Sequence, residues 1–167
     1  MKNLQNYLFE LCGEQLPSGF ECYAAAAKNL LTPLVDECYT DNAGNVIGFR
    51  KAAIPGAKKL LLDAHLDEIG LIVTHICGNG LLKVAKAGGI RVNTYPGHQV
   101  MIHHGENKIP GVVVMNDAMK GDIKDKDLYI DIGAKDAEDT RKYVEEGDPV
   151  HLNTYHLPLQ NDLLCAR

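Results

Sequence analysis

The spacing of apolar residues predicts two helices at the start of the chain. Between positions 4 and 11 the apolar residues recur three and four apart, as on one face of a helix, and Gly13 follows as a stop. A second helix is predicted through the four alanines at 24–27. Ser18 and Glu21 precede it with the spacing of a capping box, in which each residue satisfies a backbone N–H at the helix start.

The next segments add strands to these helices. Pro33 should end the second helix, because proline lacks the N–H that a helix interior needs. Two strands at 38–40 and 46–50 are expected to form a hairpin around the turn residues 42–45. The uncharged apolar run at 60–62 then predicts a buried strand. This mixture is typical of an α/β domain.

From Ile69 onward the pattern changes to short strands separated by turn residues. Strands are expected at 69–76, 81–86, 99–104, 108–115, 128–132 and 150–153. We also expect a helix at 136–146 that stops at Gly147, and a mobile loop at 119–127. Strands at this spacing are typical of a small barrel or sandwich. The sequence therefore predicts an incomplete α/β domain at 1–69 and 156–167, interrupted by an inserted β-rich, barrel-like domain at 70–155.

Charge and composition exclude several classes of function. The 167 residues carry a net charge of −5, so no basic surface is expected for nucleic acid or for an anionic membrane. No leader-like start or long apolar segment is present in the sequence. The five cysteines are scattered and show no C-x-x-C spacing, so we expect buried thiols in a cytoplasmic protein.

The most informative candidate site is the pair His65 and Asp67. Side chains two apart on a strand point to the same side, so the predicted strand would present an imidazole and a carboxylate together at its carboxyl end. Such a pair suits a metal hydrolase, in which the imidazole binds the metal and the acid fixes its tautomer. From spacing alone, a buried histidine satisfied by a neighbouring acid is the alternative.

Six segments around this pair resemble the di-metal glutamyl aminopeptidases and deblocking aminopeptidases, also called cellulase-M-like proteins. The central segment is LLLDAHLDEIGLIV, and LPSGFE and DNAGNVIGF precede it. Downstream, GGIRVNTYPGHQVMIHHGENKIPGVV, LYIDIGA and EEGDPV follow in the order and spacing of that family's inserted domain. The resemblance covers nearly the whole chain.

This resemblance implies an enzyme and a role for each residue of the pair. His65 matches the first metal ligand, and Asp67 matches the catalytic acid that orients it. The peptide bond between Asp67 and Glu68 is implied to be cis. The cofactors would be two divalent ions, zinc or cobalt, and the substrates would be peptides hydrolysed at their N-termini. The inserted domain would be PDZ-like and would mediate homo-oligomerisation.

The same resemblance implies that most of the site lies beyond the last residue, Arg167. In the family, DLLCAR is followed by an aspartate that bridges both metals, and then by the paired glutamates, a second aspartate and a last histidine. One imidazole does not hold a zinc ion that usually takes three or four protein ligands. We therefore expect this chain to be the N-terminal half of a peptidase and to be inactive alone.

Two other functions compete with this interpretation. One is a non-enzymatic scaffold, in which residues 70–155 form a self-association module. The other is a sugar hydrolase, which needs two carboxylates flanking the scissile bond. Asp63, Asp67 and Glu68 form no convincing pair of that kind, so we rank this possibility last.

The remaining chemistry-bearing residues are expected to be structural. His103 and His104 are adjacent and face opposite sides of a strand, so a metal patch with His98 is the less favoured possibility. His75 is expected to be a half-buried strand residue, and His151 and His156 are assigned structural roles. Two glycine-rich stretches, 78–80 and 88–89, lack a phosphate-loop motif and predict turns. The acidic positions 122, 125 and 127 lack the pattern of a calcium loop.

Overall fold

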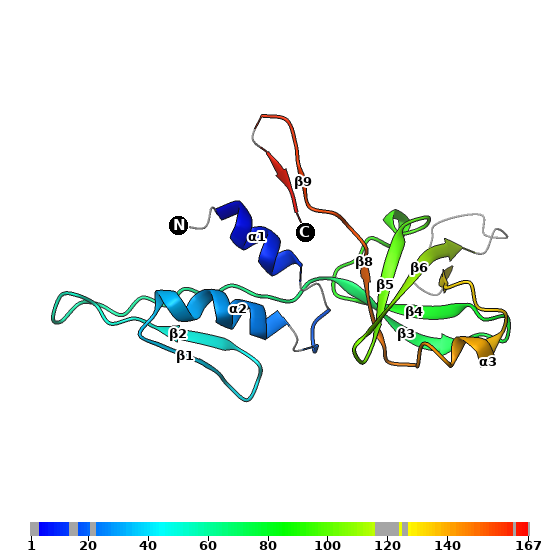
Figure 1. Ribbon diagram of the computed structural model, residues 1–167, viewed down its shortest axis with the longest axis horizontal. Helices are drawn as coiled ribbons and strands as arrows, with labels where there is room; N and C mark the ends of the chain where they lie inside the picture. Colours follow the sequence, from blue (N-terminus) through cyan, green and yellow to red (C-terminus); the bar gives the residue numbers. More distant parts are fainter. Residues whose placement is uncertain are drawn as a thin grey trace. The chain divides into compact units, whose positions relative to one another are not determined.

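The computed structural model describes residues 4–13, 17–20, 23–115, 124, 127–161 and 163–166 (Figure 1). The chain divides into two compact units. The first consists of residues 1–15, 19–67 and 156–167, and the second of residues 16–18 and 68–155. Glu21 of the expected capping box lies outside the described residues, as do all positions of the expected 119–127 loop except 124 and 127.

The first unit contains the helices and the hairpin that the sequence predicts. Helix α1 spans Leu4–Cys12, α2 spans Tyr23–Leu31, and a short 3-10 helix at Thr32–Leu34 follows where Pro33 ends the α-helical ladder. Strands β1 (Glu37–Thr40) and β2 (Val46–Phe49) pair antiparallel. A second small hairpin joins β9 (Leu157–Pro158) to β10 (Leu164–Cys165).

The expected buried strand at 60–62 is wrong for this structure. Residues 57–67 form no helix or strand, and Leu60, Leu61 and Leu62 are 82%, 87% and 85% exposed. A strand is held by hydrogen bonds to a neighbour and by side chains that cover its faces. No described strand pairs with this segment, so its apolar residues have nothing to pack on.

The expected cis peptide between Asp67 and Glu68 is also wrong. The described residues contain no cis peptide bond. A non-proline cis bond costs about 3–4 kcal/mol and persists only where the surrounding structure enforces it. The exposed segment before Asp67 provides no such enclosure.

The second unit is a closed six-stranded β-barrel, which confirms the β-rich, barrel-like prediction. Its strand order is β3-β4-β7-β6-β5-β8, and every pair in it is antiparallel. The strands span Gly70–Ile76 (β3), Leu82–Ala87 (β4), Gln99–His104 (β5), Asn107–Met115 (β6), Leu128–Asp131 (β7) and Pro149–Leu152 (β8). A second 3-10 helix lies at Val92–Thr94. Closure leaves no open sheet edge.

Alternating side chains of these strands fill the barrel. On β5, for example, Val100 and Ile102 are fully buried whereas Gln99 is exposed. Fourteen buried apolar residues form one core: Leu71, Val73, Ile76, Leu82, Val84, Ile90, Tyr95, Val100, Ile102, Val113, Leu128, Ile130, Val144 and Val150. All of them belong to the second unit. Among the described residues of the first unit, only one apolar residue, Ala24, is buried.

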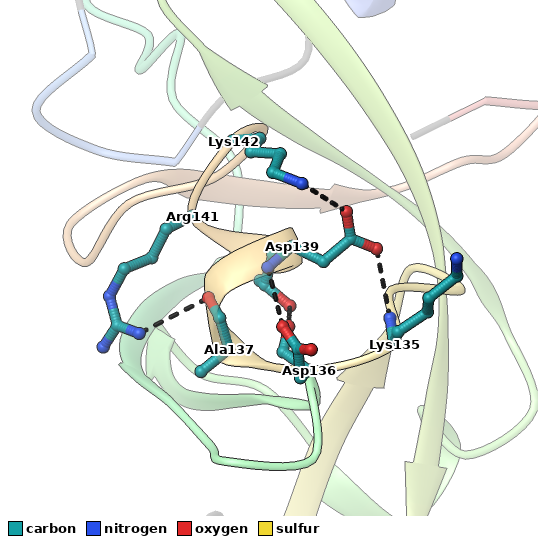
Figure 2. Close-up of polar contacts among 7 residues, drawn as sticks. Lys135, Asp136, Ala137, Asp139, Arg141 and Lys142 are labelled. Carbon is teal, nitrogen blue, oxygen red and sulfur yellow. Dashed lines mark hydrogen bonds and ion pairs between the residues drawn. The ribbon is translucent and has the colours of Figure 1, made fainter.

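Helix α3 is shorter than the sequence predicts. It spans Ala137–Thr140 rather than 136–146, although Asp136 begins it as expected (Figure 2). The chain then forms turns, because the carboxylate of Asp148 accepts the N–H of Glu145 at 2.8 Å and the backbone leads into β8. The buried Thr140 hydroxyl donates to the carbonyl of Gly80 at 2.8 Å, which fastens α3 to the β3–β4 turn.

The helices are also short in absolute terms. Within the described residues, no helix is long and apolar enough to span a lipid bilayer.

Candidate functional site

His65 and Asp67 lie against each other in the exposed segment that follows Leu62. The His65 Nδ1 atom is 2.8 Å from the Asp67 backbone carbonyl and 3.2 Å from its Oδ1. Their side chains are 84% and 38% exposed. The expected strand is absent here, so this local contact, rather than strand pleating, brings the two side chains together.

The two oxygens near Nδ1 decide the tautomer of His65. A carbonyl and a carboxylate only accept hydrogen bonds, so Nδ1 carries a proton and donates it to Asp67. The Nε2 atom then keeps its lone pair in neutral imidazole. Metal-binding histidines in proteins usually donate one ring N–H to a carboxylate or carbonyl and bind the metal through the other ring nitrogen. The assignment of His65 as a metal ligand and Asp67 as its acid stays a prediction.

Other histidines form contacts within the barrel unit. His103 and His151 lie on the neighbouring strands β5 and β8, with 2.8 Å between Nε2 and Nδ1. Burial lowers the pKa of His103, and the positive charge of Lys108 adds to this effect. His75 is exposed rather than half-buried, and its Nδ1 is 3.3 Å from Oε1 of Glu146.

A cluster that the sequence analysis missed consists of His104, Glu145 and Asp148. Each offers one nitrogen or oxygen ligand atom, and these atoms all lie within 4.8 Å of one another. In the part of the chain that the structure describes, it is the only group of three or more such side chains. His104 contacts Asp148, whereas its neighbour His103 contacts His151. The local sequence gave no signal for the cluster, because 44 residues separate His104 from Asp148.

The glycine-rich stretches form turns, as predicted. Residues 78–80 connect β3 to β4, where the Gly80 N–H donates to the Cys77 carbonyl at 3.0 Å and Gly80 has a φ of +84°. Residues 88–89 form a bend after β4. The expectation of buried thiols is wrong for the described cysteines, because Cys12, Cys38 and Cys77 are only partly buried and Cys165 is exposed.

Comparison with known proteins identifies relatives of this chain. The model of the M42 glutamyl aminopeptidase family matches residues 44–167. The Escherichia coli K12 protein SgcX is 31% identical over 176 aligned residues, which cover 99% of this chain and 47% of SgcX. A lysyl aminopeptidase of Pyrococcus furiosus is 30% identical over 122 residues, which cover 68% of this chain and 34% of that protein.

Solved structures agree with these sequence matches. The aminopeptidase APDkam598 of the archaeon Desulfurococcus kamchatkensis superposes with a TM-score of 0.81 and 28% identity, over 93% of this chain and 44% of that one. The PhTET1-12s dodecamer subunit superposes with a TM-score of 0.79 and 25% identity, over 96% of this chain and 48% of that one. The chain thus spans less than half the length of each of these four proteins.

Proposed function

This chain belongs to the M42 glutamyl aminopeptidase family, and from that premise we propose that it supplies part of a metal-dependent aminopeptidase that removes N-terminal residues from peptides. The observation that carries the proposal is the His65–Asp67 contact. His65 Nδ1 is held by Asp67, so Nε2 is the ring nitrogen left to bind a metal ion.

The residues present fit one position of a metal centre. His65 is exposed, and its protonated Nδ1 leaves Nε2 as an imidazole ligand of the kind that zinc and cobalt bind. In the complete enzyme, two divalent ions would lower the pKa of a bound water so that it can attack the scissile carbonyl. The contribution of this chain is to hold one ligand nitrogen in place through Asp67.

The described residues do not complete that centre. The single group of three potential ligands among them includes His104, not His65. Zinc usually takes three or four protein ligands, and removing the general base of a hydrolase costs about 10²- to 10⁴-fold in rate. We therefore propose that additional polypeptide, corresponding to the unmatched part of the relatives, supplies the remaining ligands and the base.

The exposed apolar residues of the first unit support this proposal. Leu60, Leu61 and Leu62 leave a continuous apolar run in solvent, immediately before His65. A sheet strand from the additional polypeptide would pair with this run and cover it, as a buried strand requires. The same event would turn residues 60–62 into the strand that their sequence predicts and would bring other ligands close to His65.

We also propose that the chain associates with copies of itself through residues 70–155. Two structural relatives are described as a dodecamer and as a peptidase that assembles into a tetrahedron or a large octahedral shell. We propose in addition that the barrel of this segment is PDZ-like. The second hypothesis is a purely structural scaffold. Both proposals require self-association, which is measured by size exclusion with light scattering. A strictly monomeric chain at high concentration would contradict self-association.

The activity test uses aminoacyl p-nitroanilides with Zn²⁺ or Co²⁺. The chain alone should release no p-nitroaniline. After co-refolding with the unmatched portion of SgcX, metal-dependent release should occur, and His65→Ala should lower it by 10²-fold or more, while Asp67→Asn lowers metal affinity or activity by about 10- to 100-fold.

The matched control is His75→Ala, which removes another exposed imidazole that pairs with an acid. This variant should keep the activity of the refolded mixture. Turnover by the chain alone, or turnover that survives His65→Ala, would contradict the proposal.

A further inference from the structure

The His104 cluster lies where the barrel closes. Antiparallel pairing of β5 with β8 places Ile102 opposite Val150, and both side chains are fully buried. His104 follows Ile102 by two residues, and Asp148 precedes Val150 by two residues, so the same side of the sheet carries both side chains. Their side chains are 36% and 8% exposed, so the cluster combines a buried carboxylate with an imidazole that solvent reaches.

The distances between His104 and Asp148 are compatible with two ligands of a shared metal ion. The Nδ1 atom of His104 is 3.3 Å from Oδ1 and 3.1 Å from Oδ2 of Asp148. A charge-assisted N–H···O bond is usually about 2.7–2.9 Å long. Two ligands at about 2.1 Å from one metal ion, at an angle between 90° and 110°, lie roughly 3.0–3.4 Å apart. The observed separations lie in this range as well as at the long end of an ordinary N–H···O hydrogen bond, so the two side chains are already spaced to share an ion.

The negative charges of the cluster also favour binding of a cation. Glu145 and Asp148 bring two carboxylates within 4.8 Å of each other, and a cation bound between them would offset the repulsion between their negative charges. The N–H of Glu145 satisfies one Asp148 oxygen at 2.8 Å. Among the ion pairs of the described residues, none joins a lysine or arginine to either carboxylate.

We propose that His104, Glu145 and Asp148 form a binding site for a divalent transition-metal ion in the barrel unit, distinct from the site proposed at His65. One imidazole nitrogen and two carboxylate oxygens suit zinc or cobalt, whereas calcium and magnesium prefer oxygen ligands alone. Glu145 is exposed and His104 is partly exposed, so water completes the coordination shell.

Such an ion would stabilise the barrel where β8 pairs with β5 and closes it. Strand β8 is joined to β5 by three register pairs and to β3 by two. The metal would tie the end of β5, through His104, to the turn that leads into β8, through Glu145 and Asp148. Metal binding is therefore expected to raise the unfolding temperature, because a ligand that binds only the folded state stabilises it.

The experiment measures Zn²⁺ binding by titration calorimetry and Co²⁺ binding by visible absorption, using the whole chain after chelator treatment. Two substitutions remove ligands: Glu145→Gln and His104→Gln. Each should raise the Kd at least tenfold and abolish the metal-induced increase in unfolding temperature. Glu145→Gln retains the backbone N–H that Asp148 uses and changes an exposed side chain, so it tests the site even if His104→Gln fails to fold.

Two matched variants separate this site from other acidic groups and from His65. Glu146→Gln removes the adjacent exposed carboxylate, and His65→Ala removes the ligand of the proposed catalytic centre. Both should keep the wild-type affinity and thermal shift. No binding by the wild type, unchanged binding in Glu145→Gln, or loss of binding in His65→Ala would each overturn the proposal.

Discussion

At the scale of single residues, His103 shows how the fold changes an acid–base group. Its ring is half-buried beside His151, and burial, followed by the charge of Lys108, lowers its pKa below the usual 6.5. The folded chain therefore binds this proton less readily than the unfolded chain. Since the unfolded state carries more protons between the two pKa values, the free energy of unfolding rises with pH in that range. The contribution is complete above pH 6.5 and is lost as the pH falls from 6.5 through the folded pKa.

This gives a prediction for pH dependence. As the pH falls below 6.5, the midpoint of urea unfolding should decrease, and His103→Gln should make the decrease smaller. Lys108→Gln should also reduce it, because one cause of the lowered pKa is removed. Circular dichroism at a series of pH values provides the midpoints. Identical slopes for the wild type and His103→Gln would show that this imidazole does not contribute.

At the scale of elements, helix α3 depends on local hydrogen bonds at its first turn. The Asp136 carboxylate accepts the N–H of Asp139 at 2.9 Å (Figure 2). The Asp139 carboxylate in turn accepts the N–H of Lys135 at 3.2 Å and pairs with the ammonium of Lys142 at 3.2 Å. The backbone hydrogen bond from Lys135 is the main cause that lowers the pKa of Asp139. This short helix thus has a defined start despite its length.

We expect Asp136→Ala to lower the free energy of unfolding by about 1 kcal/mol, because the N–H of Asp139 loses its side-chain acceptor. Asp136→Asn is the matched control, since the amide oxygen still caps the helix and stability should change little. Urea denaturation followed by circular dichroism measures both. Equal losses in the two variants would mean that the charge of Asp136, rather than its capping bond, supports α3.

At the scale of the whole molecule, apolar burial is unequal between the two units. The barrel unit holds the fourteen-residue core, whereas Ala24 is the buried apolar residue described in the first unit. Residues 51–66, which belong to the first unit, are exposed throughout and form no helix or strand. A segment without backbone pairing or packing opens at little cost in free energy.

Limited trypsin digestion should therefore cut first at Lys58 and Lys59 within this exposed segment. Lys83 and Lys86 lie on β4, which pairs with β3 along its length and with β7 at Leu82 and Lys83, and they should be cleaved much more slowly. Mass spectrometry of the early products identifies the sites, and a Lys58→Gln/Lys59→Gln double variant should delay the first cleavage. Early cleavage within β4 would contradict the expectation that the barrel is stable and that the segment 51–66 opens readily.

The sequence by itself determined the features that depend on neighbouring residues. The helix at Leu4–Cys12, the hairpin around residues 42–45 and the alternating strands of the barrel were all predicted correctly. Asp41 illustrates the reason, because its Oδ1 accepts the N–H groups of Ala43 and Asn45 at 2.9 Å within the same turn. Periodicity, caps and turn residues act over a few positions, and the printed sequence displays them directly.

Only the tertiary structure decided which distant residues meet. Pairing of β5 with β8 brings His104 to Asp148 and His103 to His151, and no local pattern encodes a contact across 44 or 48 residues. At residues 60–62 the local pattern was misleading. The apolar residues predict a buried strand, yet they are exposed. A strand is stabilised by partners outside itself, so its sequence states a preference that only a neighbouring strand can satisfy.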